Sequence, residues 1–123
     1  MGSTRKHNGI IYRKLVRDKI PEIIREVGKQ PFTRKIQGDE LKQAIAGKII
    51  EEAYELFKAL GGDNKNEVLK ESADMLEIVV AALEFHGFSM DDLLSARNER
   101  ARQRGAFCKG LFLDRTNRNS VAS

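Results

Sequence analysis

Four carboxylates stand among apolar residues in two neighbouring segments of the chain. The first segment reads KIIEEAYELFKAL and contains Glu52 and Glu55, and the second reads EVLKESADML and contains Glu71 and Asp74. Side chains three positions apart are neighbours on a helix surface, so each segment offers one pair of carboxylates. A solvated helix face would direct its charges away from apolar residues. These charges lie too close to the apolar residues for that explanation.

Helical geometry predicts where each carboxylate lies. A helix advances about 100° per residue, which places Glu71 between Met75 and Ile78, within the apolar arc of its helix. Asp74 borders the same arc. In the first segment Glu52 lies at the edge of the apolar stripe and Glu55 lies one step further round. A short loop between two helices makes them antiparallel neighbours, so the two pairs can face each other.

Carboxylates that meet at the edge of a core require compensating positive charge. Burial of unpaired charge is costly, and oxygen-only ligation suits Mg²⁺ or Mn²⁺. The absence of His or Cys at the matching positions argues against zinc. The alternative is a set of ion pairs with basic side chains, for which Lys48, Lys70 and the Arg97–Arg104 cluster are candidates. We favour a divalent cation.

The elements that position these residues are helical, and the predicted fold is an all-α, antiparallel bundle of the four-helix type, completed by oligomerisation. No segment has a convincing strand pattern. Residues 1–9 are expected to form a flexible arm, residues 10–113 the helical domain, and residues 114–123 a flexible tail. The helices are predicted as a short one capped by Asp18 and ending at Gly28, a long one from about Asp39 to Gly61, one from about Glu67 to His86, and one from the N-cap Ser89 to about Arg104. The apolar stripe of the long helix is Ile45, Ile49, Ala53, Leu56 and Leu60.

Length, composition and cysteine usage favour one soluble domain. A chain of 123 residues that is 41% hydrophobic and 33% charged suits a single compact helical unit. The lone Cys108 excludes an internal disulfide and fits a reducing compartment. The first residues lack the apolar core of a secretory signal, and no apolar run is long enough to span a bilayer. We therefore expect a cytoplasmic protein without a membrane partner.

Charge is distributed unevenly along the chain. Residues 1–48 carry a net charge of +7, residues 49–96 carry −8, and residues 97–123 carry +5. An acidic centre between basic ends suggests a cation site beside a place for anions. Helices that pair their charges across a bundle would give the same distribution, so charge alone does not decide.

The acidic motifs resemble those of a known enzyme group. Residues 51–55 read EEAYE and residues 71–74 read ESAD, while residues 14–22 read KLVRDKIPE and residues 99–107 read ERARQRGAF. These stretches, in this order, resemble the all-α nucleoside triphosphate pyrophosphohydrolase superfamily, which includes MazG and phosphoribosyl-ATP pyrophosphohydrolase. The similarity extends over roughly residues 12–113. The KLVRDKIP opening points to the MazG-like branch, and hence to nucleotide clean-up over a biosynthetic step.

The resemblance implies Mg²⁺-dependent cleavage of a nucleotide between its α- and β-phosphates, giving a monophosphate and pyrophosphate. Mn²⁺ is a possible substitute. The motif contains no Ser, Cys or His nucleophile, so direct attack by water is the expected route. Glu51 is a candidate to orient or deprotonate that water, although a solvated glutamate is an equal alternative, and Glu52 is the second catalytic candidate. By the same resemblance the metal ligands are Glu52, Glu55, Glu71 and Asp74.

Phosphate contacts are expected from the basic ends. Lys48 lies one turn before Glu52, and its alternative role is an ion pair with that residue. A solvated stripe is the alternative for the arginine row of the last helix. The candidate substrate or subunit contacts are Lys48, Lys14, Arg17, Lys19, Arg97, Arg100 and Arg104. Three aromatic residues are candidates to stack on a base, but core packing is favoured for all of them: Tyr12, Tyr54 and Phe107.

Other classes of function remain open at this point. Family resemblance implies a homodimer or homotetramer acting on a nucleotide. A non-catalytic nucleic-acid-binding bundle would use the basic ends, but the acidic centre would repel a polyanion and no recognised binding motif is present. A degenerate member kept as a regulatory oligomer is the third class. The intact set of carboxylates argues against it.

Overall fold

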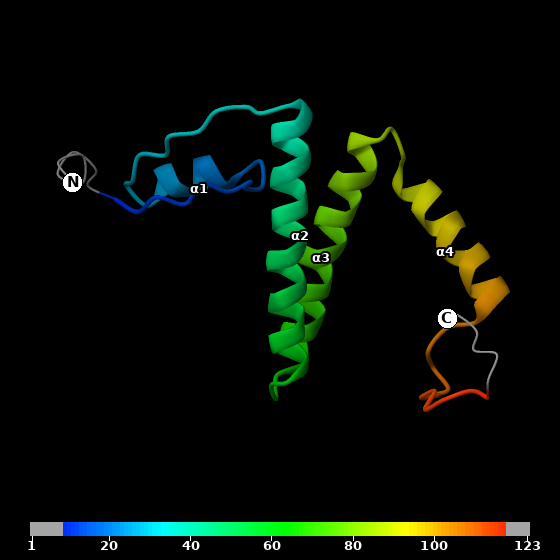
Figure 1. Ribbon diagram of the computed structural model, residues 1–123. Coiled ribbons are helices and arrows are strands. Elements are labelled where there is room, and N and C mark those ends of the chain that lie inside the picture. Colours follow the sequence, from blue (N-terminus) through cyan, green and yellow to red (C-terminus); the bar gives the residue numbers. More distant parts are fainter. Residues whose placement is uncertain (1–8, 118–123) are drawn as a thin grey trace. The chain divides into compact units, whose positions relative to one another are not determined.

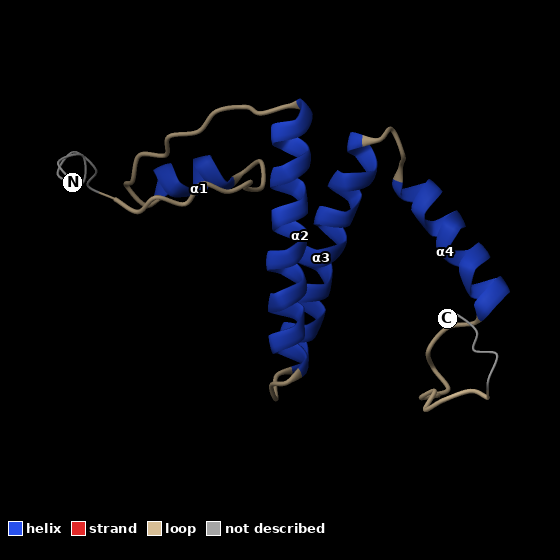
Figure 2. Ribbon diagram, in the orientation of Figure 1, coloured by secondary structure: helices blue, strands red, loops and turns tan. Residues whose placement is uncertain are grey.

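The computed structural model describes residues 9–117 and is helical throughout its regular structure (Figures 1 and 2). Within these residues there is no strand, which confirms the all-α class. Most of the predicted flexible arm, and the end of the predicted tail, lie outside the described residues. The helices are α1 (Ile20–Glu26), α2 (Gly38–Leu60), α3 (Lys65–Phe85) and α4 (Met90–Arg104).

The chain divides into two compact units at the boundary between Phe88 and Ser89. The first unit contains α1, α2 and α3, and the second contains α4 and the segment after it. No helix in the described part of the chain is long and apolar enough to cross a membrane.

Helices α2 and α3 form an antiparallel pair that lies side by side in Figure 1. Glycine terminates α2 as predicted, because Gly61 is its C-cap and donates its backbone N–H to the carbonyl of Lys58 at 3.1 Å. Asn64 then caps α3 by accepting a hydrogen bond from the backbone N–H of Asn66 at 2.9 Å. The short polar loop thus fixes the hairpin that brings the two acidic motifs together.

The start of α1 differs from the prediction. Lys19, rather than Asp18, occupies the N-cap position, and no side chain caps the helix. The backbone N–H of Ile20 donates to the carbonyl of Arg17 at 3.0 Å, so Asp18 lies within a turn that precedes the helix. In contrast, Ser89 caps α4 as predicted, in a reciprocal arrangement with Asp92.

The apolar core of the described chain is small. Among the described residues, the buried apolar ones are Ile45 and Ile78, with 6% and 7% exposure. Glu71 is buried to the same extent, at 7%. The predicted stripe of α2 is correct at its centre but wrong at Ala53 and Leu60, which are exposed. Those two residues lie at the margins of the stripe, where α3 does not cover them.

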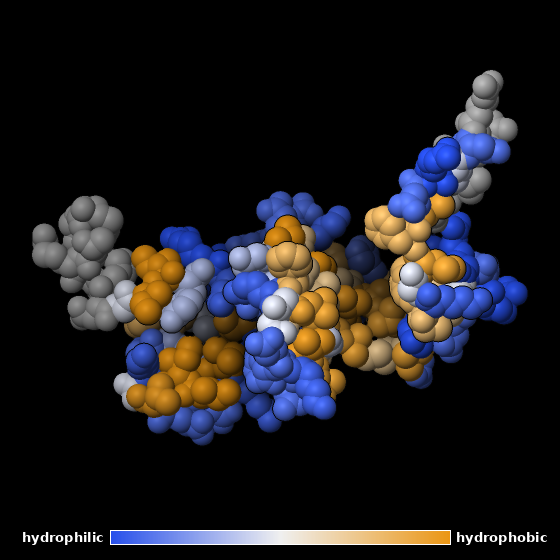
Figure 3. Space-filling model, turned by 90° about the horizontal axis from the view of Figure 1, so that it is seen from below, coloured by the Kyte–Doolittle hydropathy of each residue, from blue (hydrophilic) through white to orange (hydrophobic). Residues whose placement is uncertain are grey.

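Large apolar side chains remain exposed on the hairpin. Figure 3 shows apolar surface (orange) interspersed with hydrophilic surface on one face of the molecule. On α2 the exposed fractions are 71% for Ile50, 58% for Tyr54 and 71% for Phe57. These three residues recur at steps of four and three and so share one face, which we call the outer face of α2. The unit therefore presents an apolar helix face that it does not itself bury.

Candidate metal and nucleotide site

Three of the predicted carboxylates converge where α2 faces α3. Glu52 comes from α2, and Glu71 and Asp74 come from α3. Each contributes one oxygen, and these oxygens all lie within 4.8 Å of one another. A Mg²⁺ ion with octahedral ligation holds adjacent ligand oxygens about 3 Å apart and opposite ones about 4 Å apart, so modest side-chain rotation would bring this set onto one ion. We call these three residues the carboxylate cluster.

One oxygen of the cluster lacks a partner. Glu71 is buried in the interface between the helices, and its Oε1 accepts a hydrogen bond from Lys70 at 2.9 Å. Its Oε2 is buried and has no hydrogen-bond donor among residues 9–117. Buried polar atoms are nearly always satisfied, and a buried carboxylate oxygen without a donor is an acceptor suited to a cation. The donor set and this atom together fit Mg²⁺ or Mn²⁺.

Basic side chains surround the cluster. Lys48 lies 3.6 Å from Glu52, one helical turn earlier on α2. Lys70 lies 3.7 Å from Asp74, in addition to its contact with Glu71. Ion pairing, the alternative to metal binding, therefore also has partners in place, and two of them are the lysines expected from sequence. The ion pairs leave the buried Oε2 of Glu71 unsatisfied, so they do not account for the whole cluster.

The segment before α1 supplies two further cations. Lys14 Nζ lies 3.3 Å from Glu51 Oε1 on α2, and Arg17 Nη2 lies 2.8 Å from Asp74 Oδ1 on α3. Both side chains were candidates for contacts to substrate or a second subunit. Their proximity to the acidic motifs, across 37 and 57 positions of sequence, could not be predicted from local patterns.

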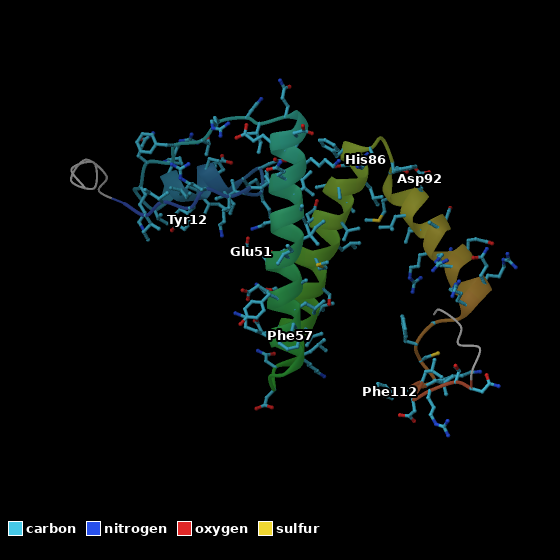
Figure 4. All side chains as sticks on the ribbon, viewed as in Figure 1. Tyr12, Glu51, Phe57, His86, Asp92 and Phe112 are labelled. Atoms are coloured by element: carbon cyan, nitrogen blue, oxygen red, sulfur yellow. The ribbon has the colours of Figure 1, made fainter. Side chains whose placement is uncertain are left out.

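Glu51 lies on the side of α2 that faces α1 (Figure 4) and is held by two lysines. Partial burial acts to raise its pKa. The hydrogen bond from Lys14 and the charges of Lys48 and Lys14 together outweigh that effect, so the pKa lies below its ordinary value. Glu51 is therefore an ionised carboxylate beside the cluster and, at 38% side-chain exposure, one that water can reach.

Glu55 is not among the converging carboxylates. Its side chain is 42% exposed and forms an ion pair with Lys58 at 3.3 Å. The cause is its position on α2, because three residues rotate a helix by about 300° and move Glu55 away from the direction of α3. Its role as a metal ligand stays a prediction.

The sequence that forms this site matches a known protein family. The family model described as phosphoribosyl-ATP pyrophosphohydrolase matches residues 12–101, which include every member of the carboxylate cluster. The chain belongs to this family. The family is named for the hydrolysis of a nucleotide phosphoanhydride, and this is the class of chemistry that membership indicates.

The chain is also similar to an uncharacterized protein of Mycolicibacterium smegmatis. It is 46% identical over 46 residues, which represent 37% of this chain and 47% of that protein. The match thus spans about half the length of the curated relative. No solved structure matches the chain.

The remaining predicted contacts of this family member are on α4 and at the start of α1. Lys19 is exposed at the start of α1. The arginine row Arg97, Arg100 and Arg104 is exposed on α4, in the second unit, and its role in phosphate binding stays a prediction. The prediction that the three aromatic residues pack in the core is wrong. Their exposed fractions are 63% for Tyr12, 58% for Tyr54 and 98% for Phe107.

Proposed function

We propose that this protein is a Mg²⁺-dependent nucleoside triphosphate pyrophosphohydrolase that cleaves between the α- and β-phosphates. The supporting observation is the carboxylate cluster with its unsatisfied Glu71 oxygen, in a chain of a pyrophosphohydrolase family. Removal of damaged or surplus nucleotides is the expected biological role. Mn²⁺ is a second metal that the same oxygen ligands would accept.

In this proposal Glu52, Glu71 and Asp74 hold the metal, and Glu55 joins them only if its side chain leaves Lys58. A bound divalent cation supplies neutralisation of phosphate oxygens and activation of the attacking water. The water oxygen bonds to the α-phosphorus, the bond to the bridging oxygen breaks, and pyrophosphate leaves with the bonding electrons. The three residues are otherwise kept together by the hairpin, so little reorganisation is needed.

Glu51 is proposed to orient the water and to accept its proton. Glu51 is ionised at neutral pH and can accept a hydrogen bond from the water, while its lowered pKa makes it a weaker base than an ordinary glutamate. Lys14 and Lys48 hold its carboxylate from two directions, at 3.3 and 3.4 Å. These contacts fix the orientation of the carboxylate, which is the contribution that positioning makes to a proton transfer.

Phosphate oxygens of the substrate are proposed to contact the basic residues next to the cluster. Lys48 and Arg17 already lie within ion-pair distance of cluster members. Lys14 reaches Glu51 from the same segment as Arg17. Lys19 and the arginine row of α4 are further candidates.

Release of pyrophosphate from a panel of canonical and modified nucleoside triphosphates tests this proposal, first with Mg²⁺ and then with EDTA. We expect a monophosphate and pyrophosphate in equal amounts with Mg²⁺ and neither product with EDTA. Glu71→Gln and Glu52→Gln should each reduce turnover at least about a hundredfold, the loss of a few kcal/mol of transition-state stabilisation. Glu77→Gln, at an exposed position of α3 outside the cluster, is the matched control.

Folded wild-type protein without turnover on any nucleotide would overturn the proposal. Circular dichroism of each variant must match the wild type, because a loss caused by unfolding would carry no information. Retention of full activity by Glu71→Gln would exclude the cluster as the metal site.

A second candidate reaction is hydrolysis of phosphoribosyl-ATP, which the description of the matched family favours. The chemistry at the phosphoanhydride is the same and only the substrate's second sugar differs. Including phosphoribosyl-ATP in the panel separates the two candidates by the ratio of kcat/KM. The MazG-like preference stays a prediction from the KLVRDKIP opening.

We further propose a homodimer or homotetramer. The support is the outer face of α2, where Ile50, Tyr54 and Phe57 are all more than half exposed. Contiguous apolar surface of this kind marks an interaction site, and a second copy of the chain would supply a matching face. A cytoplasmic location without nucleic-acid partners remains the accompanying expectation.

A further inference from the structure

The non-helical stretch formed by residues 9–19 is attached to the hairpin at both helices. We call this stretch the basic segment. Lys14 contacts Glu51 on α2 and Arg17 contacts Asp74 on α3. Between the start of the segment and these contacts, Arg13 adopts a positive φ of 51°, a left-handed conformation that non-glycine residues rarely take. The segment is thus held against the acidic residues by charge.

Arg17 contacts an oxygen of Asp74 that a bound metal ion would also contact. Its Nη2 lies 2.8 Å from Oδ1 of Asp74, while Nζ of Lys70 lies 3.7 Å from Oδ2 of the same carboxylate. Both oxygens of Asp74 therefore already face a positive charge. A divalent cation that coordinates Asp74 must weaken at least one of these contacts.

Of the two cations, Arg17 is the one that can leave at lower cost. Lys70 also contacts Glu71 at 2.9 Å, so its departure would break two ion pairs. Arg17 makes one ion pair among the described residues, and its side chain is 55% exposed. Exposed ion pairs are weak, and a residue on a non-helical segment moves without disturbing a helix.

A released arginine is well suited to the substrate. The guanidinium group binds phosphate oxygens through two parallel hydrogen bonds and stays charged at all relevant pH values. From this we infer that Arg17 exchanges partners: it neutralises Asp74 while the cluster lacks a divalent cation, and contacts a substrate phosphate once the cation has bound. This inference rests on the proposed function.

The exchange has opposite consequences for metal and nucleotide. Arg17 competes with the cation for Asp74 when no nucleotide is present, so its removal strengthens metal binding. Arg17 contacts the phosphate in the loaded site, so its removal weakens nucleotide binding. A residue with a purely structural role would not change the two affinities in opposite directions.

Isothermal titration of the full-length protein with Mn²⁺ alone tests the first half. We expect Arg17→Gln to lower the Kd for Mn²⁺ about two- to fivefold, the scale of an exposed ion pair. Arg34→Gln is the matched control, because Arg34 forms an exposed ion pair with Glu40, outside the cluster. The Kd of this variant for Mn²⁺ should equal that of the wild type. Arg17→Lys keeps the charge and should return the Kd towards the wild-type value.

Hydrogen exchange and kinetics test the second half. Saturating Mn²⁺ should increase amide exchange within the basic segment of the wild type, because one of its two attachments is released. On the best substrate from the panel, Arg17→Gln should raise KM about tenfold, the scale of a charge-assisted hydrogen bond, and change kcat less. Arg34→Gln should leave both constants unchanged.

The outcomes separate this inference from the proposed function. Wild-type binding of Mn²⁺ with an identical Kd in Arg17→Gln would overturn the exchange and leave the pyrophosphohydrolase proposal standing. A lowered Kd with an unchanged KM would overturn the phosphate contact. Absence of Mn²⁺ binding by the folded wild type would remove the metal site, and both proposals with it.

Discussion

Each face of α2 carries residues that would usually lie on the other face, although the apolar stripe around Ile45 is buried as usual. On the side towards α3, the side chain of Glu52 is only 12% exposed and lies beside the buried Glu71. On the outer face, Ile50 and Phe57 are each 71% exposed. A helix that served only to stabilise a monomer would place these residue types the other way round.

Both halves of this inversion are unfavourable for an isolated chain. A buried carboxylate loses hydration that ion pairs replace only in part, and exposed apolar side chains forgo about 25 cal/mol for each Å² left in water. Each half becomes favourable when a different ligand is added. A divalent cation would satisfy the inner face, and a second copy of the chain would satisfy the outer one.

The largest expected effect is at the apolar centre of the hairpin. Ile78 is 7% exposed, and Ile78→Ala leaves a cavity between α2 and α3. We expect the free energy of unfolding to fall by about 3 kcal/mol. Urea denaturation followed by circular dichroism measures this change.

Ile50→Ala supplies the contrast, because it removes the same atoms from a side chain that is 71% exposed. At protein concentrations where the chain is monomeric, its effect should be below about 0.5 kcal/mol. Equal losses of stability in the two variants would contradict the difference in burial between Ile78 and Ile50.

A smaller effect is expected for a charge placed on the outer face. Ile50→Glu should shift the oligomer towards monomer and raise its dissociation constant at least about tenfold, because a two-fold interface contains each substitution twice. Light scattering coupled to size-exclusion chromatography, over a range of concentrations, measures the shift. Ile50→Val retains an apolar side chain and should assemble as the wild type does. A wild type that is monomeric at every concentration would contradict the assembly proposal.

The sequence predicted the helices better than it predicted their surroundings. The limits of α2, α3 and α4 follow from local signals such as Gly61, Asn64 and Ser89, and the structure agrees with them within one or two residues. Helical geometry also placed Glu71 correctly within the apolar arc of α3. These successes share a cause, since capping and periodicity act over a few residues.

The failures come from interactions between distant segments. Asp18 has the chemistry of a cap, but the turn from Arg17 to Ile20 places it before the N-cap. Glu55 matches the acidic motif, but α3 does not extend to its side of α2, and Lys58 neutralises it instead. The contacts of Lys14 and Arg17 depend on the path of the basic segment, which no local pattern specifies.

The smallest expected effect on stability concerns the ion pair of Lys14 with Glu51 and depends on pH. The pKa of Glu51 is lowered in the folded protein from an ordinary value of 4.5, partial burial being outweighed by Lys14 and Lys48. A lowered pKa contributes stability that is fully present above the unfolded value and is lost as pH falls through the folded value. Lys14→Met should therefore be less stable than the wild type by less than about 1 kcal/mol at pH 7.

That difference should shrink as pH falls below 4.5, because the carboxylate that Lys14 stabilises becomes protonated. Urea unfolding at pH 7, 5, 4 and 3 measures this difference in stability. High salt should reduce the difference at pH 7, because salt screens an exposed ion pair. Lys65→Met, at an exposed position outside the acidic motifs, controls for the loss of one positive charge. A difference that stayed constant from pH 7 to pH 3 would mean that Lys14 stabilises the fold through its apolar stem. The basic segment would then be attached to α2 by packing, and not by the charge of Lys14.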